Sequence, residues 1–438
     1  MPRLLADEPR APHAPVPAQQ PQHRSHELDW LRAFIILALV PGHAIGFFTA
    51  NTAKYLGTQY ASPIGLSTLM IVGTWGMALL FLVAGAAAYH MLVRRSPRRF
   101  IGDRSVRLLI PFLFACLTLI PLQDYLIVHA FPDVLDRIPA PPGLDPHLTA
   151  SPLTFYRWFV AGYVSFLMHY TPQYEFIFWS HLWFIPRLLA ISLLTLPLLL
   201  WLRGARGTRL IAWLATLCER QRGAVFLLAL PLALILAVFG WQWQGWQVVG
   251  APDGANVLSQ FLYYTLVYVY GFVLYSDVRL RQAVRRDGGM ISLVVAIVAF
   301  IITQIPGFGV GNQALAHDLS AGGIMAAMLR ATAAWLCIVS ILGLSMRFLA
   351  FTNRFGQYLT EASYPFYVLH LAVLYLIGLP LLASGAPVVV DFLAMVILTY
   401  GITLAVYELF VRRVRPVRAL FGMSKKSAMG RKSTPASA

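Results

Sequence analysis

The chain has 438 residues, of which 58% are hydrophobic and only 12% are charged. Soluble globular domains carry about 25% charged residues, so this composition excludes that class and indicates a polytopic membrane protein. The net charge of +16 does not indicate nucleic-acid binding, because basic residues collect in the cytoplasmic loops of membrane proteins. We expect contact with membrane lipid and no nucleic-acid partner.

The two ends of the chain differ from the rest. Residues 1–25 are rich in proline, alanine and glutamine and contain no apolar run. They lack the apolar core of a cleaved signal peptide, so we expect a disordered cytoplasmic arm before an uncleaved first membrane helix. Residues 412–438 are basic and then polar, and we expect a disordered cytoplasmic tail close to anionic lipid. The transmembrane domain is expected between these ends, over residues 26–411.

Apolar stretches close to the length that a bilayer requires follow one another through this domain. We predict an all-α transmembrane helical bundle of ten spans, at about 30–50, 66–92, 105–128, 181–202, 224–242, 257–276, 290–307, 325–346, 363–383 and 387–411. The aromatic stretch 152–170 is interpreted as re-entrant or interfacial and stays outside this count. It lies in the longest outer loop, 129–180, where we expect an external substrate to meet the protein.

The distribution of basic residues agrees with this topology. Of the 34 Lys and Arg, the predicted outer segments contain Lys54, Arg137 and Arg157, and the spans contain Arg32, Arg187 and Arg330. All the others lie in the predicted inner segments. The positive-inside rule is therefore satisfied at every loop when both termini are cytoplasmic.

The usual cofactor and metal motifs are missing from the sequence. Cys116, Cys218 and Cys337 have no paired spacing, so neither a disulfide framework nor a zinc site is indicated. The chain also contains no HExxH motif, Walker loop or dinucleotide fingerprint. We expect no metal site and no permanently bound cofactor.

The first span carries Arg32 and His43 within its apolar run. A charged side chain at membrane depth costs roughly 2.5–3.5 kcal/mol, which makes such a residue a functional candidate. The spacing places His43 on the same helical face as Arg32, about 16 Å further along the axis, and Asp29 is the expected ion-pair partner of Arg32. The alternatives are a packed neutral histidine and an arginine that reaches the inner interface.

Three further groups of polar residues begin later spans. Arg104 and Arg107 share one face at the inner start of the third span. They are either a phosphate clamp or ordinary positive-inside charges. His181, Trp183 and Arg187 begin the fourth span, and Ser363, Tyr367 and His370 form a polar face at the start of the ninth. The small-residue patch around Gly85 in the second span is most simply a helix-packing face.

Together these residues resemble the acyltransferase 3 family of integral membrane O-acyltransferases. The resemblance covers about residues 26–411 in order, and the His181-Leu-Trp-Phe run is similar to the branch that includes the succinyltransferase of periplasmic glucans. The chain differs in having Ala84 where the family often has serine before the glycine, which weakens a catalytic role for that position.

The resemblance implies an enzyme that moves an acyl group, acetyl or succinyl, from acyl-CoA to a hydroxyl of a carbohydrate or cell-envelope glycan. The donor is expected on the cytoplasmic side, at Arg104 and Arg107. The predicted catalytic residues are His43 as the base, Arg32 and His370, because histidine titrates near operating pH. His181, Trp183, Arg187, Ser363 and Tyr367 are expected on the acceptor side or in support, and the bacterial inner membrane is the expected location.

A proton-coupled transporter or flippase of a glycan or lipid-linked substrate is the alternative function. Such carriers also place histidine and arginine within the membrane. The chain has no repeat between its halves and no matching pair of interrupted helices, which are common features of secondary transporters. The sequence therefore favours the enzyme.

Overall fold

The computed structural model describes residues 25–48, 63–131, 151–170, 175–239, 254–302 and 321–423, and these residues are helical with no strand among them. The helices are α1 (His26–Gly46), α3 (Pro63–Arg94), α4 (Pro97–Ala130), α6 (Pro152–Met168), α7 (Glu175–Trp179), η2 (Ser180–Trp183), α8 (Phe184–Leu194), α9 (Leu196–Arg203), α10 (Ala205–Arg220), η3 (Ala224–Leu228), α11 (Ala229–Phe239), α12 (Gly254–Ser276), α13 (Val278–Asp287), α14 (Met290–Ile302), α15 (Ala321–Phe348), α16 (Arg354–Leu382), α17 (Val388–Val406), the π-helical turn η5 (Tyr407–Val411) and α18 (Arg415–Leu420). The prediction of an all-α helical bundle is confirmed.

Each of the ten predicted spans overlaps helical residues, although 181–202 is divided among η2, α8 and α9, and 224–242 between η3 and α11. Among the described residues, seven helical segments are long and apolar enough to cross a membrane: His26–Gly46, Trp75–Arg94, Pro97–Ala130, Ile177–Leu194, Met328–Phe348, Arg354–Leu382 and Val388–Val411. The other three predicted spans fall on α12, which bends by 108° into α13, and on the shorter apolar helices Ala224–Phe239 and Met290–Ile302. The aromatic stretch left outside the count forms α6.

Polar caps define where several helices begin. The side chains of Ser96, Asp277 and Asn353 accept hydrogen bonds from backbone N–H groups in the first turns of α4, α13 and α16. Caps of this kind satisfy N–H groups that have no partner within the helix. The cap at Asp277 also separates α12 from α13, so the chain turns sharply at this residue.

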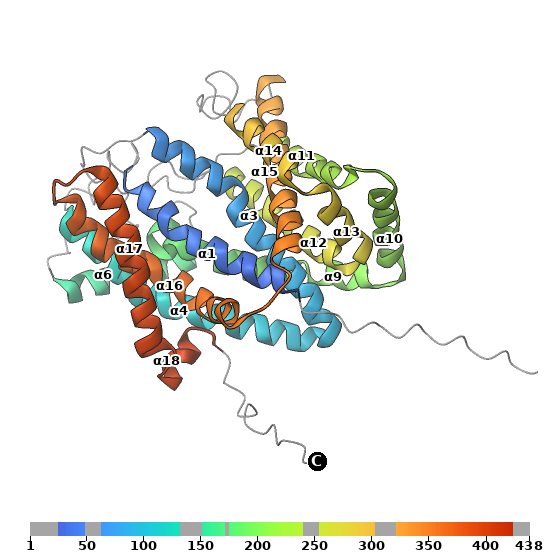
Figure 1. The fold of residues 1–438 in the computed structure, drawn as a ribbon. Helices are drawn as coiled ribbons and strands as arrows, with labels where there is room; N and C mark the ends of the chain where they lie inside the picture. The colour runs from blue at the N-terminus through green and yellow to red at the C-terminus, as the bar shows by residue number, and fades with distance from the viewer. Residues whose placement is uncertain are drawn as a thin grey trace, which may run out of the picture.

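The helix α1 lies between α3 on one side and α16 and α17 on the other (Figure 1). Arg32 donates a hydrogen bond of 3.3 Å to the carbonyl oxygen of Thr360, and eleven residues later the ring of His43 stacks on that of His370. These two contacts show that α1 and α16 are parallel. Parallel spans cross the membrane in the same direction, as predicted for the first and ninth spans.

The helices α3 and α12 touch through their backbones. A Cβ atom added at Gly85 would lie 1.8 Å from the carbonyl oxygen of Tyr268, and one added at Gly271 would lie 2.0 Å from that of Leu82. Glycine allows such close approach because it has no Cβ. The packing role predicted for the Gly85 patch is confirmed.

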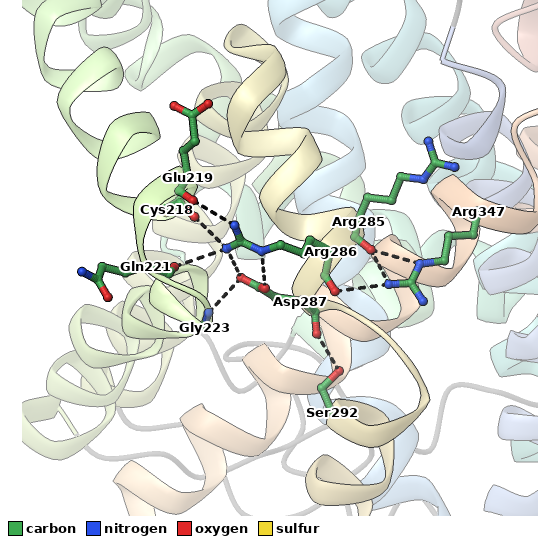
Figure 2. A network of polar contacts seen from close by, with 9 residues as sticks. All are labelled: Cys218, Glu219, Gln221, Gly223, Arg285, Arg286, Asp287, Ser292 and Arg347. Atoms are coloured by element: carbon green, nitrogen blue, oxygen red, sulfur yellow. Dashed lines mark hydrogen bonds and ion pairs between the residues drawn. The ribbon is translucent and has the colours of Figure 1, made fainter.

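A polar network joins the ends of α10, α13 and α15 (Figure 2). Arg286 donates to the carboxylate of Asp287 and to carbonyl oxygens near the end of α10, those of Cys218, Glu219 and Gln221. Arg347 donates to the carbonyl oxygens of Arg285 and Arg286. Cations placed at helix C-termini stabilise the carbonyl groups that have no partner there. The network therefore fixes α13 against its neighbours.

The predicted tail is partly ordered. Residues 412–423 are described, and Arg415–Leu420 forms α18. Arg418 makes an ion pair of 3.5 Å with Glu361 on α16. The expectation of disorder from residue 412 onward is therefore wrong for this first part of the tail. The remaining residues 424–438, like residues 1–24 of the predicted arm, lie outside the described part of the chain.

The close approach of α3 and α12 makes a prediction about stability. Gly271→Ala should lower the thermal unfolding midpoint of the purified protein, because overpacking a tight contact costs about 1–3 kcal/mol. Gly401→Ala in α17 is the matched control, since no atom lies within 4 Å of its added Cβ. Equal midpoints for the two variants would contradict the backbone contact.

Candidate active site

Three histidines from distant parts of the chain meet inside the bundle. They are His43 on α1, His181 in η2 and His370 on α16. The ring centroids lie 5.2 Å apart for His43 and His370, 5.0 Å for His181 and His370, and 6.4 Å for His43 and His181. His370 has no exposed surface and His181 is 7% exposed. We call these three residues the histidine cluster.

The carbonyl oxygen of Tyr367 fixes the proton positions on two of these rings. His181 Nε2 lies 3.0 Å from this oxygen, and His370 Nδ1 lies 2.7 Å from it. A carbonyl oxygen only accepts hydrogen bonds, so both of these nitrogens must carry the hydrogen. In the neutral rings, His181 Nδ1 and His370 Nε2 then keep their lone pairs. Both atoms are buried and have no hydrogen-bond partner among the described residues.

Tyr367 also holds η2 against α16 through its hydroxyl group. The hydroxyl donates a hydrogen bond of 2.6 Å to the carbonyl oxygen of His181. The side chain of each residue therefore donates a hydrogen bond to the backbone carbonyl oxygen of the other. These two bonds fix both the position and the orientation of the His181 ring. The predicted supporting role of Tyr367 has a physical basis in this contact.

The residue before His181 is conformationally unusual. Ser180 has φ of +46° without being a glycine, a conformation that proteins tolerate mainly where surrounding contacts enforce it. Its Oγ accepts a hydrogen bond of 3.1 Å from Gln123 of α4. This contact places the start of η2 against the third predicted span.

Gln123 and Asp124 were missed by the sequence interpretation. Gln123 is 1% exposed, and both its Oε1 atom and Asp124 Oδ2 are buried with no hydrogen-bond partner in the described ranges. Both residues lie within the third predicted span. The argument that singled out Arg32, a polar side chain inside an apolar run, applies equally to Asp124.

Arg32 and Ser363 lie apart from the histidine cluster. Ser363 Oγ and Arg32 both donate to the carbonyl oxygen of Thr360, at 3.0 and 3.3 Å. Seven residues separate Ser363 from His370, which corresponds to about 10 Å along α16. Arg32 also lies 3.8 Å from Asp29, so the predicted ion pair is confirmed. These contacts connect the inner parts of α1 and α16.

Trp183 and Arg187 face α12. The guanidinium of Arg187 lies 4.7 Å from the centroid of the Trp183 ring and donates a hydrogen bond of 3.1 Å to Gln260. The Trp183 ring is 5.8 Å from that of Tyr264. The structure therefore places Trp183 at the end of η2 and Arg187 in α8, outside the histidine cluster.

The predicted arginine pair of α4 has two different environments. Arg104 is partly buried and donates a hydrogen bond of 3.1 Å to the carbonyl oxygen of Ala84, with its guanidinium 5.5 Å from the Phe100 ring. Its Nε is buried and has no partner in the described part of the chain. Arg107 is exposed. A clamp made by both side chains stays a prediction.

The histidine cluster does not have the geometry of a metal centre. No group of three His, Cys, Asp or Glu side chains among the described residues could hold a metal ion. Two of the histidines instead direct a ring N–H at one carbonyl oxygen, which leaves the second nitrogen of each neutral ring with its lone pair. The arrangement can accept a proton from a substrate within the bundle.

The Tyr367 hydroxyl provides a test of this arrangement. Tyr367→Phe should lower both stability and activity, because it leaves the buried His181 carbonyl without this donor at a cost of about 1–3 kcal/mol. Tyr400→Phe is the control, since it removes a similar hydroxyl bond of 2.8 Å to Leu37 on α1. It should lower the unfolding midpoint without the same loss of rate. Equal activities for the two variants would contradict the positioning role of Tyr367.

Comparison with known proteins identifies the family. The family model described as the acyltransferase domain, acyltransferase 3, matches residues 25–408. Curated relatives include the glucans biosynthesis protein C of Salmonella paratyphi A (strain ATCC 9150 / SARB42), Salmonella agona (strain SL483) and Salmonella enteritidis PT4 (strain P125109). Each is 22% identical over 400 residues, which cover 90% of this chain and 93% of the relative. No solved structure gives a significant match.

The family match and the helical bundle lead to the same conclusion. The matched region contains the histidine cluster, the arginines of α4 and nearly all of the membrane-spanning helices. The chain belongs to the acyltransferase 3 family and is an integral membrane enzyme that transfers acyl groups.

Proposed function

We propose that this protein transfers an acyl group, acetyl or succinyl, from acyl-CoA to a hydroxyl of a carbohydrate, with a cell-envelope glucan as the acceptor. The similarity to the glucans biosynthesis protein C supports a glucan acceptor. The observation that carries the proposal is the histidine cluster, because O-acylation requires a base that removes the proton of the acceptor hydroxyl.

The reaction is a direct transfer in this proposal. A histidine takes the proton of the acceptor hydroxyl, and the oxygen attacks the thioester carbonyl carbon. A C–O ester bond forms, the C–S bond breaks, and the thiolate of coenzyme A leaves and receives the proton. We assign the role of base to His43, whose ring stacks on that of His370.

The neighbouring residues then position this base and its substrates. His370 and His181 are oriented by the Tyr367 carbonyl and provide lone pairs inside the bundle for proton transfer. We assign His181, Trp183 and Arg187 to the acceptor side. Ser363 and Tyr367 support α16, and the enzyme would act in the bacterial inner membrane.

The donor is proposed to enter from the predicted inner side. Coenzyme A carries phosphates at one end and its thiol at the other, so the phosphates need cations near the membrane surface while the acyl group reaches inward. Arg104 and Arg107 lie in the N-terminal part of α4, and Arg32 precedes His43 by eleven residues on α1. Arginine suits phosphate because its planar guanidinium can donate two parallel hydrogen bonds.

Loss of the base should abolish most of the activity. His43→Ala should reduce acyl transfer by about 10²- to 10⁴-fold, the usual contribution of a general base, while the protein stays folded and inserted. The measurement is release of coenzyme A from acetyl-CoA and succinyl-CoA by purified protein with a glucan acceptor. His129→Ala is the control, since this histidine is exposed near the end of α4, where its ring stacks on that of Tyr125. His43→Ala activity above about a tenth of wild type would move the role to His370 or His181.

The arginine clamp is tested by substitutions that separate shape from charge. Arg107→Lys should raise the KM for acyl-CoA, and Arg107→Ala should raise it further, because lysine keeps the charge but loses the planar fork. A residue that serves only the positive-inside rule would tolerate lysine without change. Kinetics at varied acyl-CoA distinguish the two, and an unchanged donor KM in Arg107→Lys would exclude Arg107 from the clamp.

A further inference from the structure

The four arginines of α13 fall into two pairs with different surroundings. Arg279 and Arg286 are seven residues apart and face α10, whereas Arg281 and Arg285 are four residues apart and share another face. All four belong to one predicted inner loop, where the positive-inside rule is a sufficient reason for basic residues. Their contacts show that the pairs have different roles.

Arg279 and Arg286, the pair that faces α10, make ion pairs and hydrogen bonds within the protein. Arg279 makes ion pairs with Asp277 at 2.9 Å and Glu219 at 3.8 Å. Arg286 is bound by Asp287 and by carbonyl oxygens near the end of α10 (Figure 2). All three nitrogens of each guanidinium group donate to protein acceptors, so these two arginines are the less suited to a ligand.

The other pair lines a pocket between α1, α13 and α15. The pocket has a volume of about 270 Å³ and is lined by Glu27, Val278, Arg281, Gln282, Arg285 and Met346. Arg285 contributes only its carbonyl oxygen to the network, and its side chain points away from it (Figure 2). Its guanidinium has no ion-pair or hydrogen-bond partner within the described ranges.

Arg281 is held in place but keeps free donors. Its Nη1 donates a hydrogen bond of 2.7 Å to the carbonyl oxygen of Tyr275, and its guanidinium lies 5.7 Å from the centroid of the Tyr275 ring. The remaining N–H groups of the guanidinium have no hydrogen-bond partner among the described residues. A preorganised arginine beside an unpaired one is a suitable pair for a phosphate group.

The remaining polar groups of the pocket suit hydroxyl and amine groups. Glu27 is only 9% exposed and accepts a hydrogen bond of 3.0 Å from the Tyr275 hydroxyl. One carboxylate oxygen and the Gln282 amide are left to bind a sugar hydroxyl or a base amine. The negative charge of Glu27 also repels a second phosphate group. The pocket therefore favours a ligand with one phosphate, surrounded by hydroxyl groups and an amine.

We infer that this pocket binds the phosphorylated nucleoside end of the acyl donor, with Arg281 and Arg285 on its ribose 3′-phosphate. The inference rests on the proposed function, since it requires acyl-CoA as the donor. The volume is close to the lower limit of small-molecule pockets, which suits one end of coenzyme A rather than the whole molecule. The same phosphate chemistry is offered by an anionic lipid headgroup, and the experiment separates these two sources.

The position of the pocket agrees with this assignment. Glu27 precedes His43 by sixteen residues on α1, which corresponds to about 24 Å along the helix axis. Coenzyme A is elongated, with the phosphorylated adenosine at the end opposite the thiol. A donor anchored at the pocket could therefore direct its acyl group toward the histidine cluster.

Binding of coenzyme A and of 3′-dephospho-coenzyme A to the detergent-purified full chain tests the inference by calorimetry. Arg285→Gln should weaken binding of coenzyme A about tenfold or more, the usual effect of losing a charge-assisted hydrogen bond. It should not change binding of the dephospho form, which wild type itself should bind more weakly. Arg285→Lys should fall between wild type and Arg285→Gln.

Arg206→Gln is the matched control, because Arg206 is an exposed arginine of α10 outside the pocket, and its affinities should equal those of wild type. Unchanged coenzyme A affinity in Arg285→Gln, or an equal loss for both ligands, would overturn the assignment. Thermal stabilisation by phosphatidylglycerol but not phosphatidylcholine nanodiscs, lost in Arg285→Gln while coenzyme A affinity is kept, would assign the pocket to lipid. Wild type that binds neither form of coenzyme A would instead refute the proposed donor.

Discussion

The carbonyl oxygen of Tyr367 accepts hydrogen bonds from two histidine rings inside an apolar bundle, and the geometry of the candidate site depends on it. Water is scarce at membrane depth, so a ring N–H there must find a protein acceptor or lose several kcal/mol. Because His181 and His370 use the same acceptor, one backbone atom sets both tautomers. The Tyr367 hydroxyl then returns a bond to the His181 backbone, so η2 and α16 cannot shift independently. Two histidine rings are thereby held in place beside His43, the proposed base.

The helices that carry this site are held by two kinds of contact. Within the membrane, α3 and α12 approach until backbone meets backbone at Gly85 and Gly271, because lipid offers no hydrophobic drive for association and close packing must supply it. At the predicted inner ends, arginines bind carbonyl groups that helix termini leave without partners. The first kind of contact fixes distances between helices, and the second fixes α13 at the end of α12.

The arginines of this chain have several different roles. Most of them satisfy the positive-inside rule, which counts charge alone. Their contacts distinguish arginines that tie helix ends together, such as Arg286 and Arg347, from arginines with unpaired donors, such as Arg285 and Arg104. A guanidinium N–H group without a protein partner remains able to donate to a phosphate oxygen. In an enzyme family whose proposed donor carries three phosphates, these side chains are the natural candidates for recognition.

From the sequence alone we could predict the all-α class of fold and the helical face shared by Arg32 and Asp29, whereas seven rather than ten of the described helical segments are long and apolar enough to cross a membrane. Both predicted features follow from local apolar length and helical period, which are read within about twenty residues. The sequence also singled out His43, His181 and His370, but it could not show that their rings lie within 6.4 Å of each other. The proximity of the three rings depends on how the helices pack, since the three histidines lie on different helices. The same reason explains why the arginines of α13 could not be divided into pairs, because partners across helices leave no periodic signal in the chain.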